Sequence, residues 1–171
     1  MEWESRIISH LENGKNLFQN GKPQEAEKEF LSCLSPQPEI IQLGLKRTKT
    51  ILKLQAKAAC HLANLLSDLD KIGDALPLYL TAQKFDPDEI QYWIDFAYAL
   101  RFAKIYEGPE VKEAIKKCLQ KEGVCHQNLA SAAISLIKDE NDPLLALLID
   151  RALIPDDLLE LKLTQLRRNH P

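Results

Sequence analysis

Apolar residues recur at intervals of three and four along almost the whole chain, and this spacing predicts amphipathic α-helices. The strict alternation that marks half-buried strands is nearly absent. Proline, glycine and aspartate interrupt the helical pattern at short intervals, as helix ends require. We therefore expect an all-α protein with helices over residues 4–20, 23–34, 45–69, 72–85, 88–105, 109–121, 125–138, 143–152 and 156–168. Three aspartates near helix starts are expected to cap free N–H groups: Asp86, Asp142 and Asp156.

Two segments share one pattern of small, aromatic and proline residues. The spacing is 4, 3 and 5 positions in both: Ala26, Phe30, Cys33 and Pro38, then Ala75, Tyr79, Ala82 and Pro87. Small residues allow two helices to approach closely, while the aromatic ring fills the gap to the next pair. The proline ends the second helix. The first helices carry Gly14 and Ala63 at the matching small position, and a third unit begins at Trp93.

This pattern resembles the tetratricopeptide repeat (TPR) family. The resemblance implies an antiparallel helical-hairpin superhelix with about three repeats, near residues 7–38, 56–87 and 90–122. Pro38 and Pro87 lie 49 positions apart rather than about 34, so residues 39–55 are an insertion that lengthens the next helix. Degenerate helices over residues 124–168 are expected to cap the array. The length of 171 residues fits a single domain, residues 1–171.

Composition and charge narrow the class of protein. The net charge of −3 argues against a dedicated nucleic-acid binder. No run of about 18 uncharged apolar residues predicts a transmembrane helix, and the acidic first residues are unlike a signal peptide, so we expect a cytoplasmic protein. The cysteines lack the spacing of a metal site and are expected to be buried thiols: Cys33, Cys60, Cys118 and Cys125.

The chain carries no recognisable catalytic motif. The nucleophile-elbow, zinc-protease, phosphate-loop and dinucleotide-binding patterns are all missing, and the four histidines show no metal-ligand spacing. We therefore expect no catalytic site, no cofactor and no metal, and hence a protein that is not an enzyme.

A TPR-like array presents the first helices of its hairpins on a concave face, where peptides and proteins bind. The resemblance thus implies a protein–protein interaction scaffold or adaptor. The residues expected on this face are polar and of mixed charge: Lys15, Gln19, Lys57, His61, Asn64, Gln91, Asp95, Tyr98 and Arg101, with Leu11 and Asp68 beside them. Tyr98 and Arg101 are the expected anchors, because Tyr and Arg carry much of the binding energy at interfaces.

One branch of the family grips chaperone C-terminal carboxylate tails with Lys, Asn and Arg side chains. The clamp positions of that branch fall here on Leu11, Lys15, His61, Gln91 and Asp95. Because Asp95 would repel a carboxylate at the position of the clamp arginine, we do not expect a chaperone tail as the partner.

A basic stripe adds a second candidate surface. Lys46, Lys49, Lys53 and Lys57 share one face of the predicted helix. They form either a solvated face or an electrostatic contact for an acidic partner, membrane headgroups or nucleic acid. Nucleic acid is the least favoured of these, since no aromatic residues are interleaved.

The C-terminal segment supports a different alternative. Residues 142–168 are similar to a segment of some bacterial TPR proteins that joins the repeats to a methyltransferase or glycosyltransferase domain. The chain would then be the N-terminal recruiting module of a larger enzyme. Incomplete repeats with exposed apolar faces would also allow a homo-oligomer.

Overall fold

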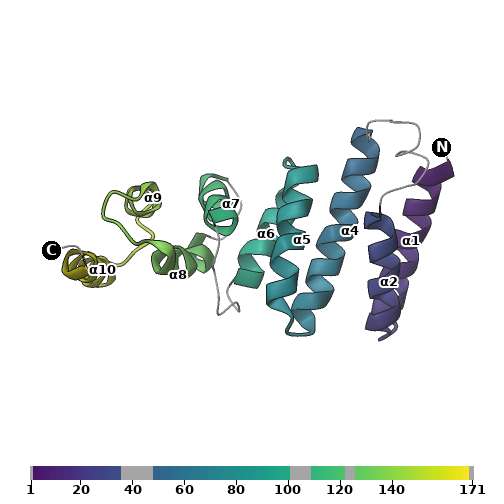
Figure 1. Ribbon diagram of the computed structural model, residues 1–171, viewed down its shortest axis with the longest axis horizontal. Helices are drawn as coiled ribbons and strands as arrows, with labels where there is room; N and C mark the ends of the chain where they lie inside the picture. Colours follow the sequence, from purple (N-terminus) through teal and green to yellow (C-terminus); the bar gives the residue numbers. More distant parts are fainter. Residues whose placement is uncertain (1, 36–47, 101–108, 122–125, 170–171) are drawn as a thin grey trace. The chain divides into compact units, whose positions relative to one another are not determined.

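The computed structural model describes residues 2–35, 48–100, 109–121 and 126–169. These residues form nine α-helices and no strand, which confirms the all-α prediction (Figure 1). Within the same residues, no helix is both long and apolar enough to cross a bilayer. The chain divides into two compact units, Met1–Asp95 (unit 1) and Phe96–Pro171 (unit 2). The single domain expected from chain length remains a prediction.

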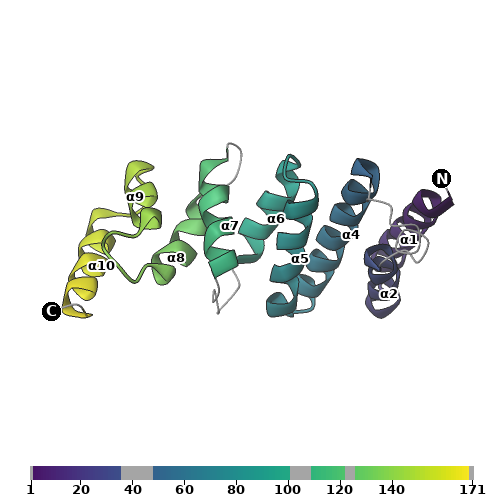
Figure 2. The same ribbon diagram turned by 45° about the horizontal axis from the view of Figure 1, so that its top comes forward.

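Unit 1 consists of two helical hairpins and the beginning of a further helix. Its helices are α1 (Glu2–Gln19), α2 (Pro23–Leu34), α4 (Lys49–Asp68), α5 (Ile72–Phe85) and the first half of α6 (Ile90–Leu100). Helix α1 packs against α2 and α4 against α5, and the members of each pair lie side by side in both views (Figures 1 and 2). Helix α4 also packs against α1 and α2, so the two hairpins are stacked.

The two hairpin turns of unit 1 have the same geometry. Gly21 has a φ of 73° in the first turn, and Asp70 has a φ of 60° in the second. In each turn the next residue donates its N–H to a carbonyl five positions earlier, Lys22 to Leu17 at 2.9 Å and Lys71 to Leu66 at 2.8 Å. This left-handed ending satisfies carbonyl groups that the helix end leaves open. Because only three residues separate the helices, each pair is antiparallel.

The packing of α1 on α2 explains the small residues of the first hairpin. Ala26, Phe30 and Cys33 are all buried, as are their counterparts in α5. A Cβ atom built on Gly14 would lie 2.6 Å from Cε1 of Phe30, closer than carbon atoms can approach. The Phe30 ring therefore occupies the space that any side chain at position 14 would need.

Unit 2 contains the second half of α6 and four further helices. These are α7 (Pro109–Gln120), α8 (His126–Leu136), α9 (Pro143–Asp150) and α10 (Asp156–Asn169). Helix α7 packs against α8 and α9, which also contact each other, and their shared core includes Ile115, Leu129 and Leu144. Because the predicted third repeat crosses the boundary between the units, the superhelix of three repeats remains a prediction.

Helix caps explain why α4 and α6 begin later than expected. Helix α4 begins at Lys49 rather than 45, because Thr48 is extended and its Oγ1 accepts the N–H of Ile51 at 3.3 Å. Helix α6 begins at Ile90 rather than 88, because Oε1 of Glu89 accepts the N–H of Gln91 at 3.2 Å. The expectation that Asp86 caps this helix was wrong. Asp142 caps α9 as predicted, and the predicted helix end at 105 lies outside the described residues.

Candidate interaction surface

Helix α4 presents basic side chains along its exposed side. Lys49, Lys53 and Lys57 are exposed and four positions apart, which places them within about 80° of one another around the helix axis. We call these three residues the lysine row. The same side of α4 continues into His61 and Asn64, both half-buried. The α4 residues of the predicted basic stripe and of the predicted partner-binding face therefore form one surface. Lys46, the first residue of the predicted stripe, lies outside the described residues.

The lysine row is electrostatically unfavourable for its own helix. None of its members forms an ion pair with another described residue, and the first turn of α4 contains no acidic residue. Lysines four positions apart repel each other, and Lys49 lies at the positive end of the helix dipole. Helix α10 shows the favourable arrangement, with acidic residues in its first turn and arginines in its last.

His61 connects the lysine row with the first hairpin. Its ring stacks on Phe30 of α2, with the ring centroids 5.7 Å apart and the planes inclined by 14°. Burial lowers the pKa of His61, and the charges of Lys57 and Lys15 lower it further, against the weaker opposing effects of Asp95 and Glu12. His61 is therefore neutral at pH 7.

Two lysines and two carboxylates thus act on one half-buried ring, and the effect of the lysines is the larger. Lys15 lies on α1 and Lys57 on α4, and both are close enough to His61 to affect its pKa. Lys15 is partly compensated, because its Nζ lies 3.0 Å from Oε1 of Glu12. Lys57, in contrast, forms no ion pair with a described residue.

A hydrogen-bond network joins α4 to α5 and to the first half of α6. Asp95 accepts hydrogen bonds from Asn64 Nδ2 at 3.0 Å, from Cys60 Sγ at 3.2 Å and from Gln91 Nε2 at 2.7 Å. The hydroxyl of Tyr79 donates to Asn64 Oδ1 at 2.5 Å. Asn64, Gln91 and Asp95, which were expected to face a partner, are hydrogen-bonded within this network, and their role in partner binding remains a prediction. The network connects the first half of α6 to α4.

The other predicted residues have different positions. Gln19 is exposed at the end of α1, and Asp68 is exposed at the end of α4. Leu11 is only 2% exposed, so the expectation that it faces a partner was wrong; its apolar side chain packs in the core. Tyr98 is 57% exposed and belongs to unit 2. Arg101 lies outside the described residues.

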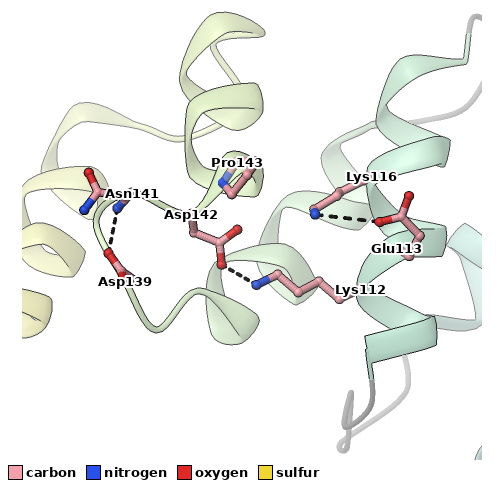
Figure 3. A pocket seen from close by; sticks show the side chains of 7 residues that line it. All are labelled: Lys112, Glu113, Lys116, Asp139, Asn141, Asp142 and Pro143. Carbon is pink, nitrogen blue, oxygen red and sulfur yellow. Dashed lines mark hydrogen bonds and ion pairs between the residues drawn. The ribbon is translucent and has the colours of Figure 1, made fainter.

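Unit 2 contains an open cleft of about 430 Å³ that none of the expected binding residues lines (Figure 3). Both of its lysines form ion pairs, one across the cleft and one within α7. Lys112 forms an ion pair with Asp142, and Lys116 Nζ lies 3.7 Å from Glu113 Oε2. Burial alone would raise the pKa of Asp142, but hydrogen bonds from Lys112 and the Leu144 N–H, with the nearby lysine charges, lower it. Sequence reasoning identified only Asp142 here, as a helix cap.

The described cysteines are buried thiols, as predicted. Burial raises the pKa of Cys33 and of Cys118 to about 12, and it also raises that of Cys60. Because the thiolate is the reactive form, these side chains are chemically inert at neutral pH. Cys125 lies outside the described residues. Across the part of the chain that the structure describes, no three His, Cys, Asp or Glu side chains are grouped to hold a metal.

No protein-family model, curated protein or solved structure matches the chain. The class that the structure defines is an all-α protein with stacked helical hairpins in unit 1. The TPR resemblance rests on the spacing of residues in the sequence.

Proposed function

We propose that the chain is a TPR-like protein-interaction module that binds a peptide or protein partner in unit 1. The binding face consists of the first helices of the hairpins, α1 and α4, with the first half of α6. The observation that carries the proposal is the gathering of Lys15, Lys57 and His61 from two stacked helices. Lys57 is exposed and forms no ion pair with a described residue, and a partner of complementary charge would complete such a surface.

The repeated construction of the two hairpins supports the TPR-like assignment. Both have buried small and aromatic residues at the same spacing, and both end their first helix with the same left-handed turn. Stacked hairpins of this kind place successive first helices on one side of the array. In a TPR-like superhelix that side is concave, and the protein acts there as a scaffold or adaptor rather than as an enzyme.

Peptide selection on the full chain tests this function without presuming the chemistry of the partner. A library of random short peptides is selected against the protein, and each enriched peptide is mapped by the amide chemical shifts that it perturbs. We expect enriched peptides of related sequence that shift amides of α1, α4 and Ile90–Asp95. Enriched peptides that map to α2, α5 or unit 2, or an absence of enrichment, would contradict the proposal.

A further inference from the structure

The lysine row on α4 carries an inference about the partner that goes beyond the function proposed above. Three lysines face solvent on one side of the helix, without an acidic residue in the first turn and without an ion pair to any described residue. A surface helix normally intersperses charges of both signs at such positions. An arrangement that is unfavourable within the fold and uncompensated there points to a negatively charged partner.

The separation of the lysines indicates the form of that partner. Four residues of α-helix advance about 6 Å along the axis, so successive lysines of the row are about 6 Å apart. Two residues of an extended chain advance about 6.6 Å. An extended segment with acidic side chains at every second position therefore matches the lysine row, one carboxylate to each lysine.

The rest of the face determines where the acidic part of the segment ends. Beyond Lys57 the surface continues to His61 and then to Asp95, whose carboxylate is already hydrogen-bonded. Asp68 is exposed at the far end of α4. Negative charge is thus favoured over the first half of α4 and disfavoured over its last turn, so the acidic stretch must be short.

A short peptide fits these charges better than an extended polyanion does. The chain as a whole carries a net charge of −3, which repels a membrane or a nucleic acid at long range. A short segment interacts mainly with charges within the Debye length, about 10 Å at moderate salt, and so with the lysine row itself. Proteins that bind single-stranded nucleic acid also stack the bases on aromatic or arginine side chains, and the row contains neither.

We propose that the lysine row of α4 binds an internal acidic segment of a partner protein, held in extended form with acidic side chains at alternate positions. This inference rests on the proposed function of the same face. It assigns recognition to the acidic side chains, so a free C-terminal carboxylate is not required.

Fluorescence anisotropy with synthetic peptides on the full chain tests the inference. The probe is a labelled peptide of alternating Glu and Ser with both ends blocked. Its comparators are the same peptide with Gln for Glu, one with the glutamates in a single block, and one with Glu at every fourth position. We expect the alternating peptide to bind most tightly and the neutral one to bind at least about tenfold more weakly, because the charge contacts are lost.

Two double variants with equal charge changes separate the lysine row from general electrostatics. Lys53→Glu with Lys57→Glu should weaken binding of the alternating peptide by about tenfold or more, since two attractive contacts become repulsive. Lys28→Glu with Lys84→Glu changes two exposed lysines on α2 and α5 and should weaken it by less than about threefold, because only long-range charge is altered. Binding of the peptide should also raise the pKa of His61, observed by NMR, because negative charge arrives beside Lys57.

Each remaining outcome overturns a specific part of the inference. Equal losses in both double variants mean non-specific attraction, and tighter binding of the peptide with Glu at every fourth position refutes the extended form. If the chain binds vesicles rich in phosphatidylserine, or a DNA oligonucleotide, more strongly than the alternating peptide, the partner is not an acidic peptide. Neutral peptides that map to α1 and α4 in the library selection refute an acidic partner while leaving the proposed function intact.

Discussion

Replacing Lys53 by glutamate is expected to stabilise unit 1 while it removes binding of acidic peptides. Lys53 is the central member of the lysine row and is exposed in the second turn of α4. It lies four positions from Lys49 and four from Lys57, so it takes part in both repulsive pairs of the row. A gain in stability from reversing this charge would show that the row is maintained at a cost to the fold.

The size of the gain follows from the two pairs. A like-charge pair at this spacing destabilises a helix by about 0.2–0.5 kcal/mol, and an opposite-charge pair stabilises it by a similar amount. Reversing the charge at position 53 removes two repulsions and creates two attractions, for a total of about 1 kcal/mol. For a chain of 171 residues this raises the melting midpoint by about 2–4 °C.

Lys84→Glu provides a matched control that should change the stability in the opposite direction. Lys84 is also exposed, and the substitution changes the net charge by the same amount, but it lies in the last turn of α5. A cation there interacts favourably with the negative end of the helix dipole. Its reversal should therefore lower the free energy of unfolding, by about 0.5 kcal/mol.

Tryptophan fluorescence during urea unfolding measures both variants in the right part of the molecule. The only two tryptophans of the sequence, Trp3 and Trp93, lie in unit 1. The difference between the variants should shrink in about 1 M salt, where the Debye length falls to about 3 Å. If Lys53→Glu destabilises unit 1, or behaves like Lys84→Glu, the lysine row is compensated within the fold and the argument for an acidic partner fails.

Three further predictions concern packing and pH. Gly14→Ala should destabilise unit 1 by about 1–3 kcal/mol in urea unfolding, because the added Cβ would clash with Phe30. Gly73→Ala should stabilise unit 1 by about 0.5–1 kcal/mol, because the added Cβ meets open space. Equal effects of the two substitutions would contradict this packing. Because the pKa of His61 is lowered in the folded chain, chiefly by burial, the unfolded chain takes up this proton first, so stability falls as the pH drops through the ordinary pKa range of histidine. His61→Gln should show a smaller fall over that range by tryptophan fluorescence, and an unchanged slope would refute the assignment. Asp142→Asn should lower the stability of unit 2 by about 1–3 kcal/mol at neutral pH, because its lysine ion pair is lost. Since the pKa of Asp142 is lowered in the folded chain, circular dichroism should show this difference vanishing as the pH falls through that pKa.

The helices could be predicted from the sequence because their determinants are local. Apolar spacing identified the buried sides, and Pro23 and Pro143 stand at the first position of their helices, where a missing N–H costs nothing. The boundaries were less certain because several polar residues compete to cap each helix. Thr48 and Glu89 supply the caps of α4 and α6, and only the folded backbone distinguishes them from their neighbours.

The network around Asp95 could not be predicted from the sequence. Asp95 and its donor Asn64 are 31 positions apart, and periodicity gives the side of a helix on which a residue lies but not its partner. The network engages residues from three helices once α4, α5 and α6 are packed. Leu11 was misplaced for a related reason. The repeat pattern predicted it on the binding face, but its apolar side chain is buried.

The hydrogen-bonding state of each candidate therefore separates residues that the fold uses from residues that it leaves available. The oxygens of Asp95 accept from three donors, so a partner would have to displace existing hydrogen bonds to reach them. A lysine of the row gains a charge contact from a partner and loses none within the described fold. Favourable contacts that displace nothing contribute most to binding. Recognition is accordingly expected to depend on Lys53 and Lys57, while Asp95 joins the first half of α6 to Cys60 and Asn64 of α4.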